Sequence, residues 1–408
     1  MKIAVITHYY SPETGAPSAR LSEMSREWVR NGHQVTVVTN FPNHPTGEIH
    51  KGYEGKSFMV ETLDGVRVVR CRTLATPNKG LVFKTLAHLY FMVMSVFQGK
   101  QEIAGCDVII VSSPTLFSVV GAWWLGLRLG IPYVFDVRDL WPGIFVELGV
   151  LKNRFVIWGL ERLELFLYNK SSAVVTVTRA FKADIANRGV PETKIHFVPN
   201  GVDVARYAAS PKSTELAMRL GLEGKFIVLY CGAHGISHAL GKIVDTAELL
   251  KGDRDVHFLF VGDGAEREQL IARTKQRGLG NVTFLPSQAK DEIPRFYNLA
   301  DVCLVPLRNI PMFRTFIPSK MFEIMGCERP IVASVEGESE EIFRLAESAI
   351  VVPPEDSAAI ARGIITLKGD SALGRRMGAS GRRYVVANFS RELLARNYLD
   401  VFAGVLKK

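Results

Sequence analysis

A segment of the second half of the chain, RTFIPSKMFEIMGCERPIVAS, predicts a short helix with an unusual start. Pro318 suits the first helical position, and Gly326 suits the residue just past the end. A helix N-terminus carries partial positive charge, so acidic residues are favoured in the first turn. This start instead gathers three groups that bind anions: Arg314, Ser319 and Lys320. Together with free backbone amides, such groups are typical of a phosphate site.

The carboxylate of Glu323 lies one turn after Lys320, on the same face of this predicted helix. There it can accept hydrogen bonds from the vicinal hydroxyls of a ribose, while the cations meet a diphosphate. The alternative is an ordinary Lys–Glu pair on a solvated helix, which leaves the clustered cations without an explanation. We therefore interpret the segment as a site for a nucleoside diphosphate.

Two further candidate sites lie in the first half of the chain. In VFDVRDLWP, Arg138 can balance the charge of a departing diphosphate or grip a donor, and Asp139 can orient that group or an acceptor hydroxyl. The alternative is a buried structural ion pair. In SPETGAPSAR, Gly15 allows the backbone to approach a phosphate or a donor sugar, or it only shapes a turn. Arg20, on the helix that follows, is a second candidate for the same anion.

Metal chemistry is not indicated by the acidic residues or the cysteines. Asp253 and Asp255 resemble a metal-binding pair, but they precede their strand, so we interpret them as a solvated turn. The five cysteines lie far apart without CxxC spacing, which is typical of free thiols in a reducing compartment.

Continuous apolar strands alternate with helix-length segments along the 408 residues. Strands of this kind, joined by helices, predict parallel sheets that are covered on both faces. A connector rich in Pro, Asn, Gly and Ser follows residue 198, after which the alternation restarts. We expect an α/β protein with two doubly wound, Rossmann-like domains, at residues 1–199 and 200–388, that face each other across a cleft. A last helix, within residues 389–408, would pack back on the first domain.

The formal net charge of +9 indicates an anionic partner. The basic residues are dispersed, without an Arg-rich tract or an RNA-binding signature, which excludes nucleic acid as the expected partner. Phosphorylated small molecules and an anionic membrane surface remain. The N-terminus has too short an apolar run for a signal peptide, so we expect a cytoplasmic protein.

Residues 81–97 are strongly apolar, but Lys84 and His88 interrupt them. The uninterrupted run is about half of the ~20 residues that a membrane-spanning helix needs. The segment is therefore either a buried helix or a helix that inserts partly at a membrane interface. A second apolar and basic stretch, residues 148–170, favours a peripheral position at the inner face of the cell membrane.

Five motifs along the chain resemble those of GT-B-fold glycosyltransferases of family 4, close to the L-fucosamine-transferase-like branch of bacterial surface-polysaccharide enzymes. They are HYYSPETGAPSARLSEMSREWVRNGHQVTVVT, VRDLWP, VPNGVD, FVGDG and IPSKMFEIMGCERPIVAS. The resemblance implies a retaining transfer of a sugar from a nucleotide diphosphate sugar to an acceptor hydroxyl, with no metal and no cofactor. It assigns the acceptor to the N-terminal domain and the nucleotide sugar to the C-terminal domain.

The sequence departs from the family pattern in the donor site. Of two glutamates that the family places eight positions apart, Glu323 is present, and Thr315 stands where the other would be. The family's Arg and Lys after the first strand of the second domain are absent as well, which would leave diphosphate binding to Arg314 and Lys320. The segment CGAHGISHALG offers other residues at that place: Gly232, His234 and His238.

The resemblance aligns Arg138 with the family's donor-sugar histidine, and FLPSQ with the backbone that reads the base. We predict that three residues serve catalysis: Arg138, Asp139 and Glu323. The diphosphate, ribose and base of the donor are assigned to Gly15, Gly232, His234, Leu285, Pro286, Arg314, Thr315, Pro318, Ser319, Lys320 and Glu323.

The expected activity moves a sugar from a UDP-sugar to a polyprenyl-diphosphate-linked acceptor in bacterial surface-polysaccharide synthesis, and an N-acetylated amino sugar is one candidate. The expected partners are the nucleotide-sugar donor, the lipid-linked acceptor and the cytoplasmic membrane surface. Two alternatives stay open. One is a UDP-sugar 2-epimerase of the same fold, and the other is a non-catalytic subunit that binds a UDP-sugar.

Overall fold

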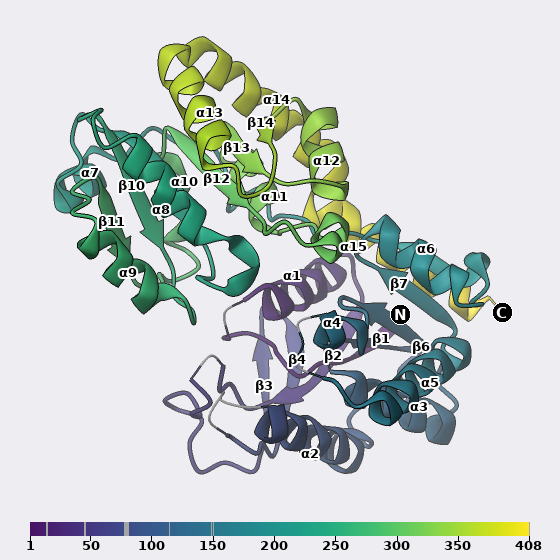
Figure 1. Cartoon of the computed structure of the whole chain (residues 1–408). Coiled ribbons are helices and arrows are strands. Elements are labelled where there is room, and N and C mark those ends of the chain that lie inside the picture. The colour runs from purple at the N-terminus through teal and green to yellow at the C-terminus, as the bar shows by residue number, and fades with distance from the viewer. Residues whose placement is uncertain are drawn as a thin grey trace. The chain divides into compact units, whose positions relative to one another are not determined.

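The computed structural model describes residues 1–13, 15–44, 46–76, 81–113, 115–147, 149 and 151–407 (Figure 1). It divides into two compact units, which we call the N-unit (Met1–Pro199 with Arg391–Lys408) and the C-unit (Asn200–Ser390). Each unit has its own sheet and its own hydrophobic core.

The N-unit sheet has the strand order β3-β4-β2-β1-β5-β6-β7-β8. All neighbours are parallel except β3 and β4, which form an antiparallel pair. The strands are β1 (Lys2–Ile6), β2 (Gln34–Asn40), β3 (Phe58–Leu63), β4 (Val66–Cys71), β5 (Val108–Ser112), β6 (Tyr133–Val137), β7 (Ala173–Thr176) and β8 (Ile195–Phe197).

Helices cover both faces of this sheet. They are α1 (Ala16–Arg30), α2 (Leu81–Gly99), α3 (Leu116–Leu129), α4 (Gly143–Glu147), α5 (Arg154–Lys170), α6 (Arg179–Asn187) and α15 (Arg391–Leu406), with a 3₁₀ turn, η1 (Glu192–Lys194). One face packs against α2, α3, α5 and α6, and the other against α1 and α15. The indole of Trp28 on α1 donates to the carbonyl of Ala395 on α15, at 3.0 Å, so the C-terminal helix closes the core of the N-unit.

The C-unit sheet is entirely parallel among its six strands, in the order β11-β10-β9-β12-β13-β14. These are β9 (Phe226–Cys231), β10 (Val256–Val261), β11 (Val282–Leu285), β12 (Val302–Pro306), β13 (Ile331–Ser334) and β14 (Ala349–Val352). The helices are α7 (Thr214–Leu220), α8 (Leu240–Leu249), α9 (Arg267–Gln276), α10 (Ile293–Leu299), α11 (Lys320–Gly326), α12 (Glu338–Ala346), α13 (Ser357–Gly369) and α14 (Ser371–Phe389). Two 3₁₀ turns, η2 (Ile236–His238) and η3 (Pro311–Thr315), complete the unit.

The C-unit is also covered on both faces, by α8, α9 and α13 on one side and by α7, α10, α11, α12 and α14 on the other. Two doubly wound parallel sheets were predicted from the alternation of apolar strands and helices, and that fold class is confirmed. The strand β3 was not predicted. In the described part of the chain, no helix combines the length and the apolar character that crossing a bilayer would require.

Candidate active site

The strand order of the C-unit places a switch point between β9 and β12. From β9 the chain first adds β10 and β11 on one side and then returns to add β12, β13 and β14 on the other. Ligands of doubly wound sheets bind at the carboxyl ends of strands at such a point. The loop after β9 and the start of α11 meet here, because a Cβ atom built on Gly232 would lie 2.7 Å from the Nζ of Lys320.

The ammonium of Lys320 is buried, and no atom of the described residues forms a hydrogen bond with it. It lies 3.9 Å from the ring centroid of Tyr230, which gives it a cation–π contact. Burial lowers the pKa of Lys320 to about 8, although Cys231 and Glu323 oppose this shift. A buried charge without hydrogen bonds is costly, so an incoming anion would satisfy a group that the protein leaves unsatisfied.

The carboxylate of Glu323 is held in place one turn further along α11. The buried hydroxyl of Tyr297, on α10, donates to its Oε2 atom at 3.0 Å. This contact holds the side chain of Glu323 from the side of the hydrophobic core, because Tyr297 belongs to the core that α11 covers. A carboxylate held in this way can receive the hydroxyls of a ribose without first having to be ordered.

Two histidines complete the surroundings of Tyr230. The ring centroids of His234 and His238 lie 5.8 and 5.9 Å from its ring centroid. Both nitrogens of His234 and the Nδ1 of His238 are buried without a hydrogen bond to any described residue. Burial lowers the pKa of His234 to about 4 and that of His238 to about 3, and the charge of Lys320 contributes to both shifts. Both imidazoles are therefore neutral at pH 7.

Three glycines allow the loops after β9 and β10 to pack backbone against backbone. A Cβ atom on Gly262 would lie 1.9 Å from the carbonyl oxygen of Gly232, and one on Gly264 would lie 2.6 Å from that of His234. Their φ angles of 145° and 152° also favour glycine. The segment VGDG thus shapes the wall around His234.

The start of α11 differs from the sequence prediction. The helix begins at Lys320, two residues after Pro318, and Gly326 is its last residue, not the residue beyond its end. The amides of Met321 and Phe322 donate to the carbonyls of Pro318 and Ser319, both at 3.1 Å, because the chain enters the helix through a tighter i→i−3 turn. These two amides are not free for a phosphate, so Lys320 itself is the main candidate for anion binding in this segment.

Arg314 and Thr315 lie on η3, ahead of α11. The guanidinium of Arg314 is 61% exposed and pairs with Glu336 at 2.8 Å, so its charge is already shared with a carboxylate. It lines a pocket of about 500 Å³ beside the ends of β13 and β14, together with Glu336, Gly337 and Glu340. The hydroxyl of Thr315 donates to the carbonyl of Met312 at 2.8 Å. The structure therefore brings Gly232, His234, Lys320 and Glu323 together, and it gives Arg314 and Thr315 local partners.

Leu285 and Pro286 lie at the carboxyl end of β11. The amide of Gly262 donates to the carbonyl of Leu285 at 3.1 Å, and the side chain of Gln288 donates to that of Pro286 at 2.9 Å. Pro286 is exposed. This edge is separated from β9 by β10 alone, so it lies on the same side of the switch point as the glycine-lined loops.

In the N-unit, Arg138 and Asp139 follow β6 at the carboxyl edge of the sheet. The amide of Arg138 donates to the Oγ of Ser113 at 2.9 Å. Burial and the nearby charge of Arg20 lower the pKa of Arg138 to about 10, while Asp136 and Asp139 oppose this shift. Burial raises the pKa of Asp139, and Arg138 lowers it in turn. Two charged groups at a sheet edge whose pKa values both differ from the ordinary ones are candidates for function.

Arg20 is a structural residue, which corrects its assignment to an anion. Its guanidinium is 1% exposed and donates to the carbonyls of Pro199 and Val198 and to the hydroxyl of Tyr398, at 2.6, 2.7 and 2.8 Å. Tyr398 in turn donates to Asp136 at 2.5 Å. The arginine thus ties α1 to the end of β8 and to α15. The helix pattern around Arg20 did not reveal this, because its partners lie 116 or more residues away in sequence.

Gly15 precedes α1 with a φ of 120°, and its carbonyl accepts from the amide of Ala19 at 2.9 Å. The neighbouring carboxylate of Glu13, which the sequence analysis missed, is buried. It accepts from the amides of Asn43 and His44 at 2.9 and 3.0 Å, and so fastens the loop after β1 to the loop after β2.

Asp253 and Asp255 lie before β10, and Lys368 donates to Asp253 at 2.6 and 2.7 Å. This agrees with a surface turn. Across the residues that the structure describes, no group of three or more His, Cys, Asp or Glu side chains has the arrangement of a metal site. Tyr230 and Tyr297 are the site residues that sequence reasoning left out. Tyrosines in apolar strands and helices look like core residues until their hydroxyls and rings are placed.

Comparisons with known proteins agree with this architecture. The family described as Glycosyl transferase 4-like domain matches residues 15–201, and the family described as Glycosyl transferases group 1 matches residues 225–370. The putative colanic acid biosynthesis glycosyl transferase WcaI of Escherichia coli is 27% identical over 99% of this chain and 100% of its own length. A GDP-mannose-dependent alpha-mannosyltransferase of Mycobacterium tuberculosis is 25% identical over 74% of this chain and 72% of its own.

Solved structures with low sequence identity share the fold. Sucrose-phosphate synthase from Thermosynechococcus elongatus has a TM-score of 0.75 at 20% identity and covers 100% of this chain, with 99% of its own chain matched. Anabaena HepE in complex with UDP-glucose has a TM-score of 0.73 at 18% identity, over 99% of this chain and 100% of its own. With a glycosyl transferase 4-like domain followed by a group 1 domain, the chain belongs to the GT-B glycosyltransferases.

Proposed function

We propose that this glycosyltransferase is a retaining enzyme that moves a sugar from a UDP-sugar to a polyprenyl-diphosphate-linked acceptor in bacterial surface-polysaccharide synthesis. The observation that carries the donor part is the buried ammonium of Lys320, which has no hydrogen-bond partner among the described residues and lies one turn before the tyrosine-held carboxylate of Glu323. The membership of the L-fucosamine-transferase-like branch belongs to the same proposal.

The donor is oriented by its two polar parts. Lys320 binds the diphosphate, with His238 and the loop at Gly232 beside it, and Glu323 accepts from the ribose hydroxyls. The base then extends toward Leu285 and Pro286. Two relatives support a role in cell-surface polymers by their names, the colanic acid enzyme of Escherichia coli and a putative teichuronic acid enzyme of Bacillus subtilis.

Uracil is the proposed base because structures with this fold, such as HepE, hold UDP or UDP-glucose. The mycobacterial relative is named for GDP-mannose, so guanine is the competing base. Calorimetric titration of the whole protein with UDP, GDP and dTDP tests this choice. We expect UDP to bind most tightly, and tighter binding of GDP would overturn the base assignment.

In the proposed reaction, the bond from the anomeric carbon to the diphosphate oxygen breaks and its electron pair stays on the departing UDP. The acceptor oxygen forms the new bond on the face that UDP leaves, and a phosphate oxygen of UDP takes the acceptor's proton. The ammonium of Lys320 stabilises the charge of the leaving group electrostatically. Activity that persists in EDTA, with the anomeric configuration retained in the product, is the expected result. Epimer formation from the donor alone would instead favour the epimerase.

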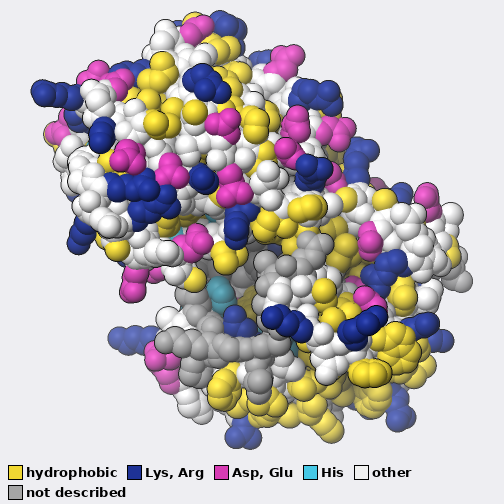
Figure 2. Space-filling model, in the orientation of Figure 1, with side chains coloured by type: hydrophobic (Ala, Val, Ile, Leu, Met, Phe, Trp, Pro, Cys, Tyr) yellow, Lys and Arg dark blue, Asp and Glu magenta, His cyan; other side chains and the backbone are white. Residues whose placement is uncertain are grey.

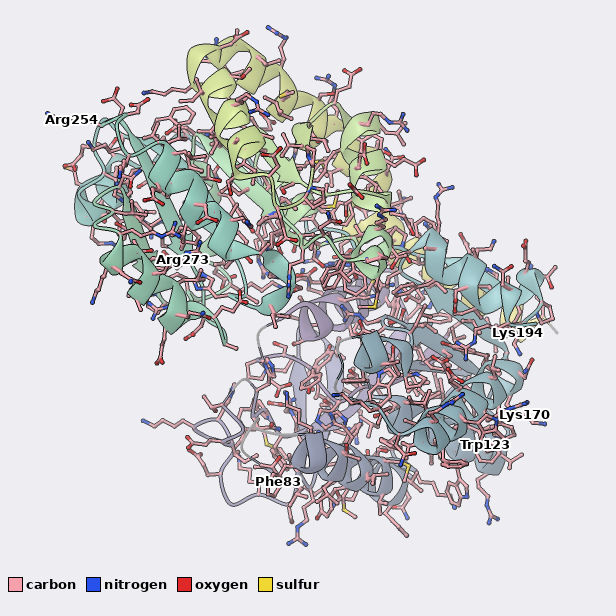
Figure 3. The ribbon with its side chains drawn as sticks, viewed as in Figure 1. Phe83, Trp123, Lys170, Lys194, Arg254 and Arg273 are labelled. Carbon is pink, nitrogen blue, oxygen red and sulfur yellow. The ribbon has the colours of Figure 1, made fainter. Side chains whose placement is uncertain are left out.

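The acceptor part rests on an exposed apolar surface of the N-unit, which we call the apolar face. Its side chains come from α2, α3 and α5, and α3 packs against both other helices. The most exposed members are Phe83, Phe97, Leu127, Phe155 and Trp158, at 54, 74, 69, 87 and 60%. Figure 2 shows hydrophobic side chains gathered with Lys and Arg along this side, and Figure 3 shows Phe83 on α2, Trp123 on α3 and Lys170 at the end of α5. Residue 148, where the second apolar stretch was predicted to begin, lies outside the described residues.

Apolar side chains among cations are suited to the interface of an anionic membrane, where a lipid-linked acceptor would be found. Flotation with liposomes that contain phosphatidylglycerol tests this. We expect the protein to float, and the double substitution Phe155→Ser and Trp158→Ser to abolish flotation. Leu249→Ser in the C-unit is the matched control, because Leu249 is 59% exposed but lies outside the apolar face. Flotation that is equal in all variants would remove the membrane from the proposal.

A further inference from the structure

Three imidazoles gather at the carboxyl edge of the N-unit sheet, outside the residues assigned to the donor. His8 follows β1, His44 follows β2, and His88 lies on α2. The ring centroids of His8 and His88 are 4.7 Å apart. Tyr9 connects the third ring, with its centroid 4.7 Å from that of His8 and 5.3 Å from that of His44. We call His8, His44 and His88 the imidazole cluster.

The imidazole cluster lies next to the switch point of its sheet. From β1 the chain adds β2, β3 and β4 on one side and β5 to β8 on the other, so the switch point falls between β1 and β5. His8 is the second residue after β1. By the same rule that places the nucleotide in the C-unit, this edge is where the N-unit would bind its own ligand.

The surroundings disfavour the cationic forms of His8 and His88 in the free protein. His8 is 6% exposed, and the side-chain amide of Asn40 lies 3.0 Å from its Nδ1. The pKa of His8 is well below its ordinary value, first because of burial and then because of His88 and His44. Burial and the charge of Lys84 lower the pKa of His88 to about 4. Each cationic form is thus disfavoured by the next, and a bound anion reverses that repulsion.

The charged side chains near the imidazole cluster are compatible with the binding of an anion. Glu13 is the nearby carboxylate, and its oxygens already accept from the amides of Tyr10, Asn43 and His44. Arg70 on β4 is engaged with Glu61 at 2.7 Å. Lys84 lies on α2, one turn before His88. Among the described residues named here, the side chains that can become cations outnumber the carboxylates.

We propose that the imidazole cluster, with Lys84, is a binding site for the phosphate groups of the acceptor. The site takes up protons as the anion binds, so that both nitrogens of a protonated ring can donate hydrogen bonds and its charge attracts the phosphate oxygens. This inference rests on the lipid-linked acceptor of the proposed function. It does not depend on where the donor nucleotide binds.

Helix α2 links this site to the apolar face. Its inner side carries His88 and the fully buried Phe91, whose ring lies 5.2 Å from that of His8. Its outer side carries the exposed Phe83, Leu86 and Phe97. One helix therefore touches the bilayer and reaches the phosphate of a lipid whose tail stays in that bilayer.

The test measures the binding of farnesyl diphosphate and of inorganic pyrophosphate to the full chain by calorimetry, with UDP present at saturation to occupy the donor site. We expect the affinity for both probes to rise about tenfold or more from pH 8 to pH 6, because the imidazoles must be protonated. The double substitution His44→Ala and His88→Ala should weaken binding about tenfold or more and remove this pH dependence. His33→Ala, in a turn outside the cluster, is the control.

Equal binding of both probes would assign the site to phosphate itself, and tighter binding of farnesyl diphosphate would add a contribution from the tail. Binding that is independent of pH, or unchanged in the double variant, would overturn the inference. The affinity for UDP, measured separately in the same variants, should not change. If the wild-type protein does not bind UDP, the proposed donor site is contradicted instead. The failure of this inference can therefore be distinguished from the failure of the proposed function.

Discussion

Lys320 in the C-unit and Arg20 in the N-unit are both buried cations near the switch points of parallel sheets, yet their surroundings differ. Arg20 donates to two carbonyls and a hydroxyl and lies 3.4 Å from Asp136. The ammonium of Lys320 faces an aromatic ring and no described hydrogen-bond acceptor. The pKa values follow this contrast, because that of Arg20 is raised and that of Lys320 is lowered.

The difference in hydrogen-bond partners distinguishes a cation that stabilises the fold, Arg20, from one that is suited to bind a ligand, Lys320. In both cases the charged nitrogen is buried, although Lys320 as a whole is half-buried and Arg20 is 1% exposed. What differs is whether the protein supplies the acceptors that a buried donor needs. Substitutions that remove each cation, and conditions that titrate one of them, test this difference.

The largest effect should come from Arg20→Leu. This change leaves two buried carbonyls without their donor and removes the cation beside the buried Asp136, so we expect the free energy of unfolding of the N-unit to fall by about 3–5 kcal/mol. Urea unfolding followed by circular dichroism measures it. Arg30→Leu on the same helix is the control, because Arg30 is 64% exposed and its pair with Glu27 should contribute less than about 1 kcal/mol. Equal losses in both variants would contradict a structural role for Arg20.

Lys320→Met should reduce ligand affinity and not stability. We expect stability to be unchanged or slightly higher, because an ammonium without hydrogen bonds is removed from the interior. The affinity for UDP should fall about 100-fold, which corresponds to about 2.7 kcal/mol. Calorimetry with UDP measures the loss, and Lys242→Met, at a lysine 47% exposed on α8, is the control. Undiminished UDP affinity would remove Lys320 from the donor site.

Tyr297→Phe should have a smaller effect, because it removes one hydroxyl from the support of Glu323 and leaves the ring. We expect UDP to bind about tenfold more weakly, in line with a hydrogen bond to a charged group. The difference in affinity between UDP and 2′-deoxy-UDP should also narrow, which a purely structural loss would not produce. Tyr168→Phe is the matched control, since Tyr168 donates to Glu164 at 2.7 Å in the N-unit.

The smallest effect is the pH dependence of UDP binding. The free enzyme's Lys320 has a pKa of about 8, and a bound diphosphate would raise it. Binding is therefore strongest below that pH, and affinity should fall about twofold between pH 7 and pH 8 as the free lysine loses its proton. Lys320→Arg keeps its charge over this range, so the fall should disappear in that variant. A fall that persists there would assign the titration to another group.

Much of the fold could be predicted from sequence because apolar strands in parallel sheets are continuous. A strand that was not predicted, β3, has an exposed face, and its side chains alternate between exposed and half-buried. Its hairpin with β4 turns at Asp64 and Gly65, both with positive φ, so the Asp-Gly pair was the signal that strand continuity overlooked.

The site could be predicted less well, because long-range contacts decide which charges are free. Lys320 and Glu323 were identified from local spacing on one helix. Arg314 has the same local setting, but Glu336 pairs with it from beyond β13. The supporting tyrosines, Tyr230 and Tyr297, lie in apolar segments whose pattern shows only that they are buried.

Helix α15 belongs to the N-unit, but the polypeptide reaches it only after passing through the C-unit, since the chain leaves the N-unit at Pro199 and returns at Arg391. The two connecting segments run together, with the amide of Val202 donating to the carbonyl of Phe389 at 3.0 Å. A fragment truncated at residue 199 would expose Trp28 to water and deprive Arg20 of Tyr398. Anyone wishing to produce this half in isolation should therefore splice residue 199 to residue 391 with a short designed loop.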